Sequence, residues 1–371
     1  IYCRERNLKF HDYKSVSHDG CPELCTYRDS AEGWVVSRSI EFMNEAKEKN
    51  MPFFLHASFP KPHQPYTPAQ EFWDIYDPKQ IALPPNFSYN MREAKKAPHL
   101  IYEVEKTRKR TNWYVEPKTY EHATLRKLRG YLGCISHVDY AVGEILDWLD
   151  KNGIAENTIV VYSTDHGEYA CEHGLMEKAP GICSDSVTRI PFIWRWPAKF
   201  AKGLAVNEIV ESTDMLPTLC SLAGLPVLET TDGKDISPLL RGEKFSPHAI
   251  GVTEFPFSKS VLKGKYRFVY YPKDFFKDEY PDGFGELYNV ENDPWEMKNL
   301  FFEPEYKTLV CEIHNELMDW LVTTSRFATA QPPKIIHGDQ WITRYHHSVN
   351  HDGKISPQKY LNADIWNKLR I

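Results

Sequence analysis

The stretch NTIVVYSTDHGE, residues 157–168, decides the fold. β-Branched and aromatic side chains fill its first half, which is typical of a buried strand in a parallel sheet. Residues 125–150 precede it with leucine, isoleucine and valine at helical spacing, and Gly153 marks the end of that helix. A helix that leads into a buried strand indicates an α/β fold. Asp165 and His166 then lie just past the C-terminal end of the strand.

A similar pair of elements occurs upstream. Residues 34–46 have helical periodicity, and residues 52–57 read as a short buried strand. Residues 59–85 are rich in proline and aromatic residues, so we expect an irregular excursion over the edge of the sheet. Downstream, the sequence predicts strands at 190–196 and 208–211 and a helix at 214–223. Together these elements predict a large, mostly parallel sheet flanked by helices, in a domain that spans residues 1–245.

The pattern changes after residue 245. Short strands are predicted at 250–255, 260–262, 266–271 and 286–290, and a helix at 303–321. This order predicts a small antiparallel sheet with one helix packed on it, a C-terminal subdomain of residues 246–330. Residues 331–371 show no clear period and read as a tail over the surface.

Composition excludes some classes of function. The formal net charge of −6 disfavours nucleic-acid binding, which needs a basic face. No stretch reaches the roughly 20 apolar residues of a membrane-spanning helix. The eight cysteines lack the paired spacing of a zinc site, and the compartment stays open. Asn86-Phe87-Ser88 matches a glycosylation sequon, a short pattern that also arises by chance.

Three groups of residues can carry chemistry. The first is Asp165 with His166, because a carboxylate and an imidazole at the end of a strand suit two ligands of a divalent metal. The alternative is a capping aspartate beside a hydrogen-bonded histidine. The second is Lys178, twelve residues after His166, whose ammonium can hold a tetrahedral oxyanion. An ordinary surface lysine is the alternative, and His173 nearby reads better as a structural histidine.

The third group is the proline-rich loop of residues 59–66, FPKPHQPY. Its prolines restrict the backbone, so Lys61 and His63 would be held with little conformational freedom. A histidine fixed in this way can protonate a leaving oxygen. Taken alone, the loop reads better as a rigid surface turn.

Read together, these blocks resemble the type I sulfatases of the alkaline-phosphatase superfamily. The resemblance also includes RIPFIWRWP at 189–197, TDMLPTL at 213–219 and the segment from Glu286 to Leu300. The matching blocks occur in the family's order over about residues 30–305, and such collinearity is far more specific than one motif.

The resemblance implies an alkaline-phosphatase-like α/β sandwich and a sulfuric ester hydrolase. Asp165 and His166 match two metal ligands, usually for Ca²⁺, with Mg²⁺ or Mn²⁺ as alternatives. Lys178 matches the lysine that contacts the sulfate group, and His63 the histidine near the leaving oxygen. Lys61 precedes His63 as in the iduronate-sulfatase-like branch. The implied substrates are small-molecule or carbohydrate sulfate esters, and the implied location is secreted, periplasmic or lysosomal.

One family block is absent. No cysteine here is followed by x-Pro-x-Arg, the motif whose cysteine is oxidised to the formylglycine nucleophile in the family. The resemblance therefore implies that the nucleophile lies outside this chain, that a separate N-terminal segment completes the site, and that this chain alone is inactive. Two alternatives stay open: a phosphonate or phosphodiester hydrolase of the same superfamily, and a non-catalytic binding protein or pseudoenzyme.

Overall fold

The computed structural model describes residues 20–109, 119–178, 183–227, 231–255 and 257–324. The chain forms two compact units, residues 1–317 and 318–371. The first unit holds the predicted site and every element named below except the last residues of helix α9. The expected tail at 331–371 lies outside the described residues, and the domain boundary near residue 245 stays a prediction.

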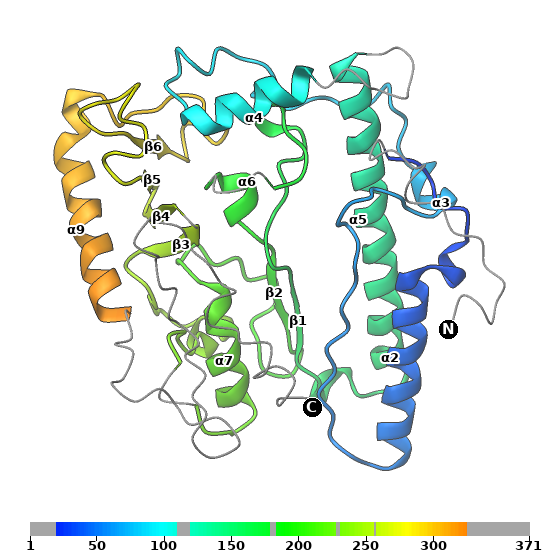
Figure 1. Ribbon diagram of the computed structural model, residues 1–371. Coiled ribbons are helices and arrows are strands. Elements are labelled where there is room, and N and C mark those ends of the chain that lie inside the picture. Colours follow the sequence, from blue (N-terminus) through cyan, green and yellow to red (C-terminus); the bar gives the residue numbers. More distant parts are fainter. Residues whose placement is uncertain (1–19, 110–118, 179–182, 228–230, 256, 325–371) are drawn as a thin grey trace, which may run out of the picture. The chain divides into compact units, whose positions relative to one another are not determined.

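Two long helices form one layer of the first unit (Figure 1). Helix α2 (Ala31–Glu48) begins at Ser30, whose side chain accepts a hydrogen bond from the Gly33 amide. Helix α5 (Tyr120–Lys151) begins in the same way at Thr119, which accepts from the His122 amide. The two helices pack against each other through apolar side chains that include Met43 and Trp148. The helices expected at 34–46 and 125–150 are thus confirmed, with longer bounds.

Only part of the predicted sheet is present in the described residues. Strand β1 (Val160–Ser163) pairs antiparallel with β2 (Phe192–Arg195), and no parallel strand pair occurs there. Residues 52–57 and 208–211 are not strands, so those two predictions are wrong at the level of hydrogen bonding. Between β1 and β2 the described chain holds only short helical turns. Without a crossover helix the chain re-enters β2 from the end where β1 finished, and antiparallel pairing follows.

The predicted C-terminal sheet is confirmed. Its four strands pair antiparallel in sequence order and are β3 (Gly251–Phe255), β4 (Ser258–Lys263), β5 (Tyr266–Tyr270) and β6 (Gly285–Asn289). Helix α9 (Lys307–Thr324) buries Ile313 and Leu317 within the first unit. Val261, Phe268 and Leu287 lie in register on one buried face of the sheet. Their neighbours Ser260, Val269 and Glu286 are buried on the other face, so both faces are covered there.

Helix α4 (Pro98–Lys109) was not anticipated from the sequence. Its buried residues Leu100, Ile101 and Val104 join a core cluster with Tyr169 and Val269, so it covers the junction between the loop after β1 and the C-terminal sheet.

None of the described helices combines the length and apolar character of a membrane span. The other elements are α3 (Gln70–Trp73), α6 (Asp185–Thr188), α7 (Met215–Leu222), α8 (Ser237–Leu240), η1 (Tyr27–Asp29), η2 (Ala155–Asn157), η3 (Glu172–Gly174), η4 (Ser212–Asp214) and η5 (Pro304–Tyr306).

Candidate functional site

Asp165 and His166 lie directly after β1. The Asp165 side chain is 81% exposed, and its Oδ2 lies 3.5 Å from His166 Nε2. Burial is the largest single influence and raises the pKa of Asp165, but the neighbouring His166 and hydrogen bonds from Thr164 and the His166 amide together lower it below the usual value. The carboxylate is therefore charged at neutral pH and open to solvent.

Lys178 lies against the same imidazole. His166 Nδ1 is 2.8 Å from the carbonyl oxygen of Gly167, which can only accept, so Nδ1 carries the proton. Nε2 is then free to accept a hydrogen bond, and the Lys178 ammonium donates one to it over 2.9 Å. The structure thus brings three of the five predicted site residues together, Asp165, His166 and Lys178, although twelve residues separate the last two.

Glu168 ties the surrounding loops together, and the sequence reasoning missed it. Its partly buried carboxylate accepts hydrogen bonds from the Tyr66 hydroxyl at 3.2 Å and from the backbone amide of Glu177. Burial raises the pKa of Glu168. Through this one side chain the loop that contains His63 and the segment that contains Lys178 are both attached to the turn after β1. The signal was present in the sequence, because Glu168 completes the Asp-His-Gly-Glu run.

Gly167 is needed for the sharp turn behind His166. Its amide donates to the Val187 carbonyl at 2.8 Å. A Cβ atom placed on Gly167 would lie 2.0 Å from the carbonyl oxygen of Ser186, far inside van der Waals contact. The backbone of helix α6 therefore lies so close to this turn that only glycine fits at position 167.

Lys61 is paired with two carboxylates. Its side chain is buried, and its ammonium donates to Glu32 Oε2 at 2.9 Å and to Glu23 Oε1 at 2.8 Å. Burial alone would lower the pKa of Lys61, but the two carboxylates raise it overall. The buried ion pair with Glu32 fixes the proline-rich loop to the start of α2, and the pair with Glu23 is partly buried. Among the described residues, no hydrogen bond joins Lys61 to Lys178 or to its partner His166.

His63 is exposed, and its Nδ1 lies 2.7 Å from the carbonyl oxygen of Gln64. Within the described residues no contact joins His63 to Asp165, His166 or Lys178. The link to them is indirect and runs through Tyr66, three residues further on, to Glu168. The loop is thus anchored at both Lys61 and Tyr66, with His63 between the anchors.

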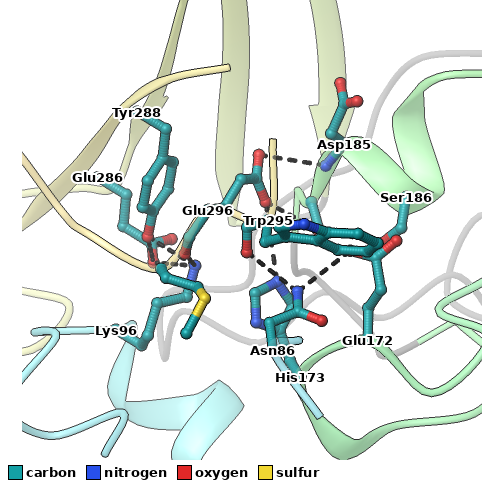
Figure 2. Close-up of polar contacts among 12 residues, drawn as sticks. Asn86, Lys96, Glu172, His173, Asp185, Ser186, Glu286, Tyr288, Trp295 and Glu296 are labelled. Atoms are coloured by element: carbon teal, nitrogen blue, oxygen red, sulfur yellow. Dashed lines mark hydrogen bonds and ion pairs between the residues drawn. The ribbon is translucent and has the colours of Figure 1, made fainter. Parts of the chain in front are cut away.

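A buried polar junction holds residues that precede and follow Lys178 in the chain (Figure 2). Glu296 lies at its centre, where it accepts hydrogen bonds from the Ser184 hydroxyl at 2.8 Å and the Asp185 amide at 3.3 Å. The Lys96 ammonium donates to the Tyr288 hydroxyl at 2.6 Å and to the Glu296 carbonyl at 3.1 Å. These contacts join the loop after β1, the region before α4 and the C-terminal sheet.

Residues of η3 belong to this junction. His173 is fully buried and its Nδ1 contacts the Tyr89 hydroxyl at 2.9 Å, so the structural interpretation of His173 is confirmed. Burial lowers its pKa well below the usual value. Asn86 is also fully buried and donates to Glu172 Oε2 at 3.2 Å and to the Trp295 carbonyl at 3.0 Å. In the folded chain the sequon asparagine is therefore not available to carry a glycan.

A shallow polar pocket of about 310 Å³ lies elsewhere in the first unit. None of the predicted site residues lines it. Its walls come from two segments of the chain. They are lined by Tyr89, Asn90, Glu93, Ala94, Lys95, Met297, Lys298, Asn299 and Glu303.

The residues after β1 fit a divalent metal in their chemistry but not in their number. A ligating histidine usually donates its other ring N–H to a carbonyl, as His166 does to Gly167. Asp165 supplies exposed carboxylate oxygens. Within the described residues, however, no group of three or more histidine, cysteine, aspartate or glutamate side chains is placed to hold a metal. A hard cation such as Ca²⁺ takes six to eight oxygen ligands.

Comparison with known families agrees with this geometry. The model of the family described as Sulfatase matches residues 18–225, more than half of the chain. The chain belongs to the sulfatase family. A second model, described as N-sulphoglucosamine sulphohydrolase, C-terminal, matches residues 171–323. The predicted sulfatase and alkaline-phosphatase-like assignment is thus confirmed.

Curated sulfatases match over most of this sulfatase chain. An ulvan-active sulfatase from Formosa agariphila is 25% identical over 83% of this chain and 55% of its own length. An arylsulfatase from Clostridium perfringens is 27% identical over 74% of this chain and 54% of its own length. The chain thus spans about half the length of these relatives.

Solved structures share the fold. A phosphonate monoester hydrolase from Silicibacter pomeroyi superimposes with a TM-score of 0.73 over 93% of this sulfatase chain and 72% of its own, at 18% identity. A structure in complex with D-glucosamine-2-N,6-O-disulfate superimposes with a TM-score of 0.64 over 79% of this chain and 70% of its own, at 21% identity. The α/β class is confirmed, whereas the large parallel sheet does not occur in the described residues.

Proposed function

We propose that this chain forms part of the active site of a metal-dependent sulfuric ester hydrolase. The observation that supports it most directly is the contact of Lys178 with His166 beside Asp165 at the end of β1. That arrangement places a carboxylate, an imidazole lone pair and an ammonium group within one small, solvent-accessible region. A sulfate ester needs these groups, because negative charge accumulates on its oxygens as the S–O bond breaks.

Each residue has a separate role in this proposal. Asp165 and His166 Nε2 would hold the divalent cation, most simply Ca²⁺, which supplies positive charge to the sulfate oxygens when bound. Lys178 would leave His166 and donate its hydrogen bond to a sulfate oxygen instead. His63, on the loop anchored by Lys61 and Tyr66, would protonate the departing alcohol oxygen. The nucleophile, formylglycine by family resemblance, would come from outside this chain.

The substrate class is proposed from the relatives. The curated relatives include ulvan-active, choline and Δ4,5-hexuronate-2-O-sulfatases, so sulfated carbohydrates occur among their names together with a small sulfate ester. We propose a small-molecule or carbohydrate sulfate ester for this chain.

The test uses the chain joined by the N-terminal portion of a sulfatase that provides Cys-x-Pro-x-Arg. Lys178→Ala should lower kcat/KM for an aryl sulfate by about 10²- to 10³-fold, as expected for loss of one group that stabilises the transition state. His63→Ala should lower kcat by about 10²-fold for a substrate with a poor leaving group and much less for an activated aryl sulfate. Lys202→Ala, an exposed lysine outside the site, should leave turnover unchanged. Unchanged turnover in both site variants would exclude these roles.

A phosphonate or phosphodiester hydrolase is the second candidate. The fold is shared with phosphonate monoester hydrolases from Silicibacter pomeroyi and Agrobacterium radiobacter. Parallel assays with a sulfate monoester and a phosphonate monoester separate the two functions. Absence of turnover of both by the completed protein would favour a non-catalytic binding protein.

A further inference from the structure

The chain between His166 and Lys178 folds back on itself. The Tyr169 amide donates to the Glu177 carbonyl at 3.2 Å, which closes a loop over the intervening residues. Lys178 follows Glu177 directly, so the backbone conformation at Glu177 sets the direction in which the Lys178 side chain leaves the loop. In this direction the Lys178 ammonium reaches the imidazole of His166.

The backbone of this loop is strained at several residues. Ala170, Cys171, His173 and Glu177 all have positive φ, with values of 46°, 81°, 51° and 72°. A residue with a Cβ atom is disfavoured in this left-handed region, and it stays there only where the surroundings hold it. The direction of the Lys178 side chain therefore depends on a contact that holds Glu177 in its left-handed conformation.

The Glu168 carboxylate makes that contact. Its Oε1 accepts a hydrogen bond from the Glu177 amide and a second one, at 3.4 Å, from the Ala170 amide. The backbone of Glu168 is itself fixed, because its amide donates to the Ser186 carbonyl at 3.0 Å. Two of the strained residues are thus bonded to one oxygen of a side chain whose own position is set by helix α6.

The second oxygen of Glu168 holds a different loop. Its Oε2 accepts a hydrogen bond from the Tyr66 hydroxyl at 3.2 Å. The Tyr66 side chain is fully buried and lies three residues after His63. The backbone that carries Lys178 and the loop that carries His63 are therefore both bonded to the same carboxylate, one to each oxygen.

We propose that Glu168 is a positioning residue for the reaction, with Oε1 fixing the backbone that carries Lys178 and Oε2 fixing the loop that carries His63. Among the described residues its carboxylate makes no hydrogen bond to either of those side chains, so it acts through their supporting backbone. This inference rests on the proposed function, in which Lys178 and His63 act on the substrate. A catalytic group displaced by about 1 Å can cost about 10²-fold in rate.

Two variants of the completed enzyme separate the position of the acceptor oxygen from the charge. Glu168→Gln removes the charge but keeps an oxygen where the Glu177 amide needs it. Glu168→Asp keeps the charge but withdraws both oxygens by one methylene group. We expect Glu168→Asp to lower kcat/KM for an aryl sulfate by at least about 10-fold and Glu168→Gln to lower it much less. Unchanged turnover in Glu168→Asp, or an equal or larger loss in Glu168→Gln, would overturn the proposal.

Double variants separate positioning from a general loss of structure. If Glu168 acts through Lys178, Glu168→Asp should have little further effect on an activated aryl sulfate once Lys178→Ala is present. A loss of folded enzyme would instead lower turnover by the same factor in both backgrounds, and that result would contradict the proposal. For a substrate with a poor leaving group, Tyr66→Phe should likewise have little further effect in the His63→Ala background. The exposed Glu208→Ala is the control and should leave turnover unchanged.

A measurement on the 371-residue chain needs no turnover. At about pH 9 an imidazole is neutral and a lysine amine is still charged, so the ¹⁵N chemical shift of His166 Nε2 reports the hydrogen bond from Lys178. Lys178→Ala gives the shift without that bond. Glu168→Asp should move the parent shift toward this value, and Glu168→Gln should leave it in place.

The two measurements fail separately. If the shift moves in Glu168→Asp but the completed protein turns over no sulfate ester, the placement of Lys178 by Glu168 stands and the proposed function fails. If the shift stays at the parent value in Glu168→Asp, the positioning role is excluded, even in a protein with full sulfatase activity.

Discussion

The Lys61 ammonium lies 2.9 Å from the Glu32 carboxylate, and both side chains are buried. Removing one partner of such a pair leaves an uncompensated charge in the interior. Lys61→Met should therefore lower the free energy of unfolding by about 3 kcal/mol, measured by denaturant titration. The double variant Lys61→Met, Glu32→Gln should recover most of that loss, because the carboxylate it leaves without a partner there, that of Glu23, is partly exposed to solvent.

This result would define Lys61 as a positioning residue for the His63 loop. If Lys61→Met instead lowered activity of the completed enzyme while unfolding was unchanged, direct contact with substrate would be the better account, as the family resemblance implies.

The substitutions Gly167→Ala and Gly143→Ala should have opposite effects on stability. A Cβ on Gly167 would collide with the Ser186 carbonyl, whereas none of the described atoms lies within 4 Å of a Cβ on Gly143 in helix α5. Gly167→Ala should cost more than about 2 kcal/mol of stability, and Gly143→Ala should add about 0.5–1 kcal/mol. Thermal unfolding of both variants checks this. Equal shifts in the same direction would contradict the close approach behind His166.

Glu172 predicts a dependence of stability on pH. Burial, more than any other cause, raises its pKa from 4.5 to about 7. The folded state therefore holds this proton more tightly than the unfolded chain. The stabilising contribution is complete below about pH 4.5 and is lost as the pH rises through about 7.

Glu172→Gln should remove this dependence while keeping an acceptor for Asn86. At pH 8 the variant should be more stable than the parent by roughly 1–2 kcal/mol, a value reduced to allow for partial exposure. Denaturation at pH 5 and pH 8 measures the difference, with the exposed Glu48→Gln as control. A gain of the same size at both pH values would rule out titration of Glu172 as the cause.

Divalent cations should stabilise the chain alone only weakly, because the described residues offer two donors, Asp165 and His166, at the site. With a dissociation constant near 1 mM, 1 mM Ca²⁺ would add about 0.4 kcal/mol to stability. Asp165→Asn should remove even this. Stabilisation above about 1.5 kcal/mol that survives Asp165→Asn would indicate a different metal site.

The sequence predicted the elements whose signals are local. The stripe on α5 and the order of β3 to β6 follow from periodicity and turn residues, and both are confirmed. The strand at 52–57 failed for a different reason: its side chains alternate as in a strand, but pairing depends on a partner that the local sequence does not contain. Helix α4 was missed because its apolar stripe is short and interrupted by charge.

The site residues also divide into those with a local sequence signal and those that depend on distant partners. Asp165, His166 and Lys178 stood out because chemistry and family order coincide there, and the structure brings them together. Lys61 resembled a substrate ligand in the sequence, and only the fold reveals that Glu23 and Glu32, far from it in order, occupy its ammonium. Glu168 was overlooked because its partner Tyr66 lies about a hundred residues away. Long-range contacts of this kind are not visible in a local motif.

The order β3-β4-β5-β6 has a consequence for how the chain acquires its structure. Each of these strands pairs with its neighbour in sequence, so little chain entropy is lost in closing the loops between them. Phe53 and Val160, which pack against the same apolar cluster, must instead be brought together across about a hundred residues. Because local contacts form faster than distant ones, we expect the C-terminal meander to acquire protected amides early in refolding and the region around His166 to follow later.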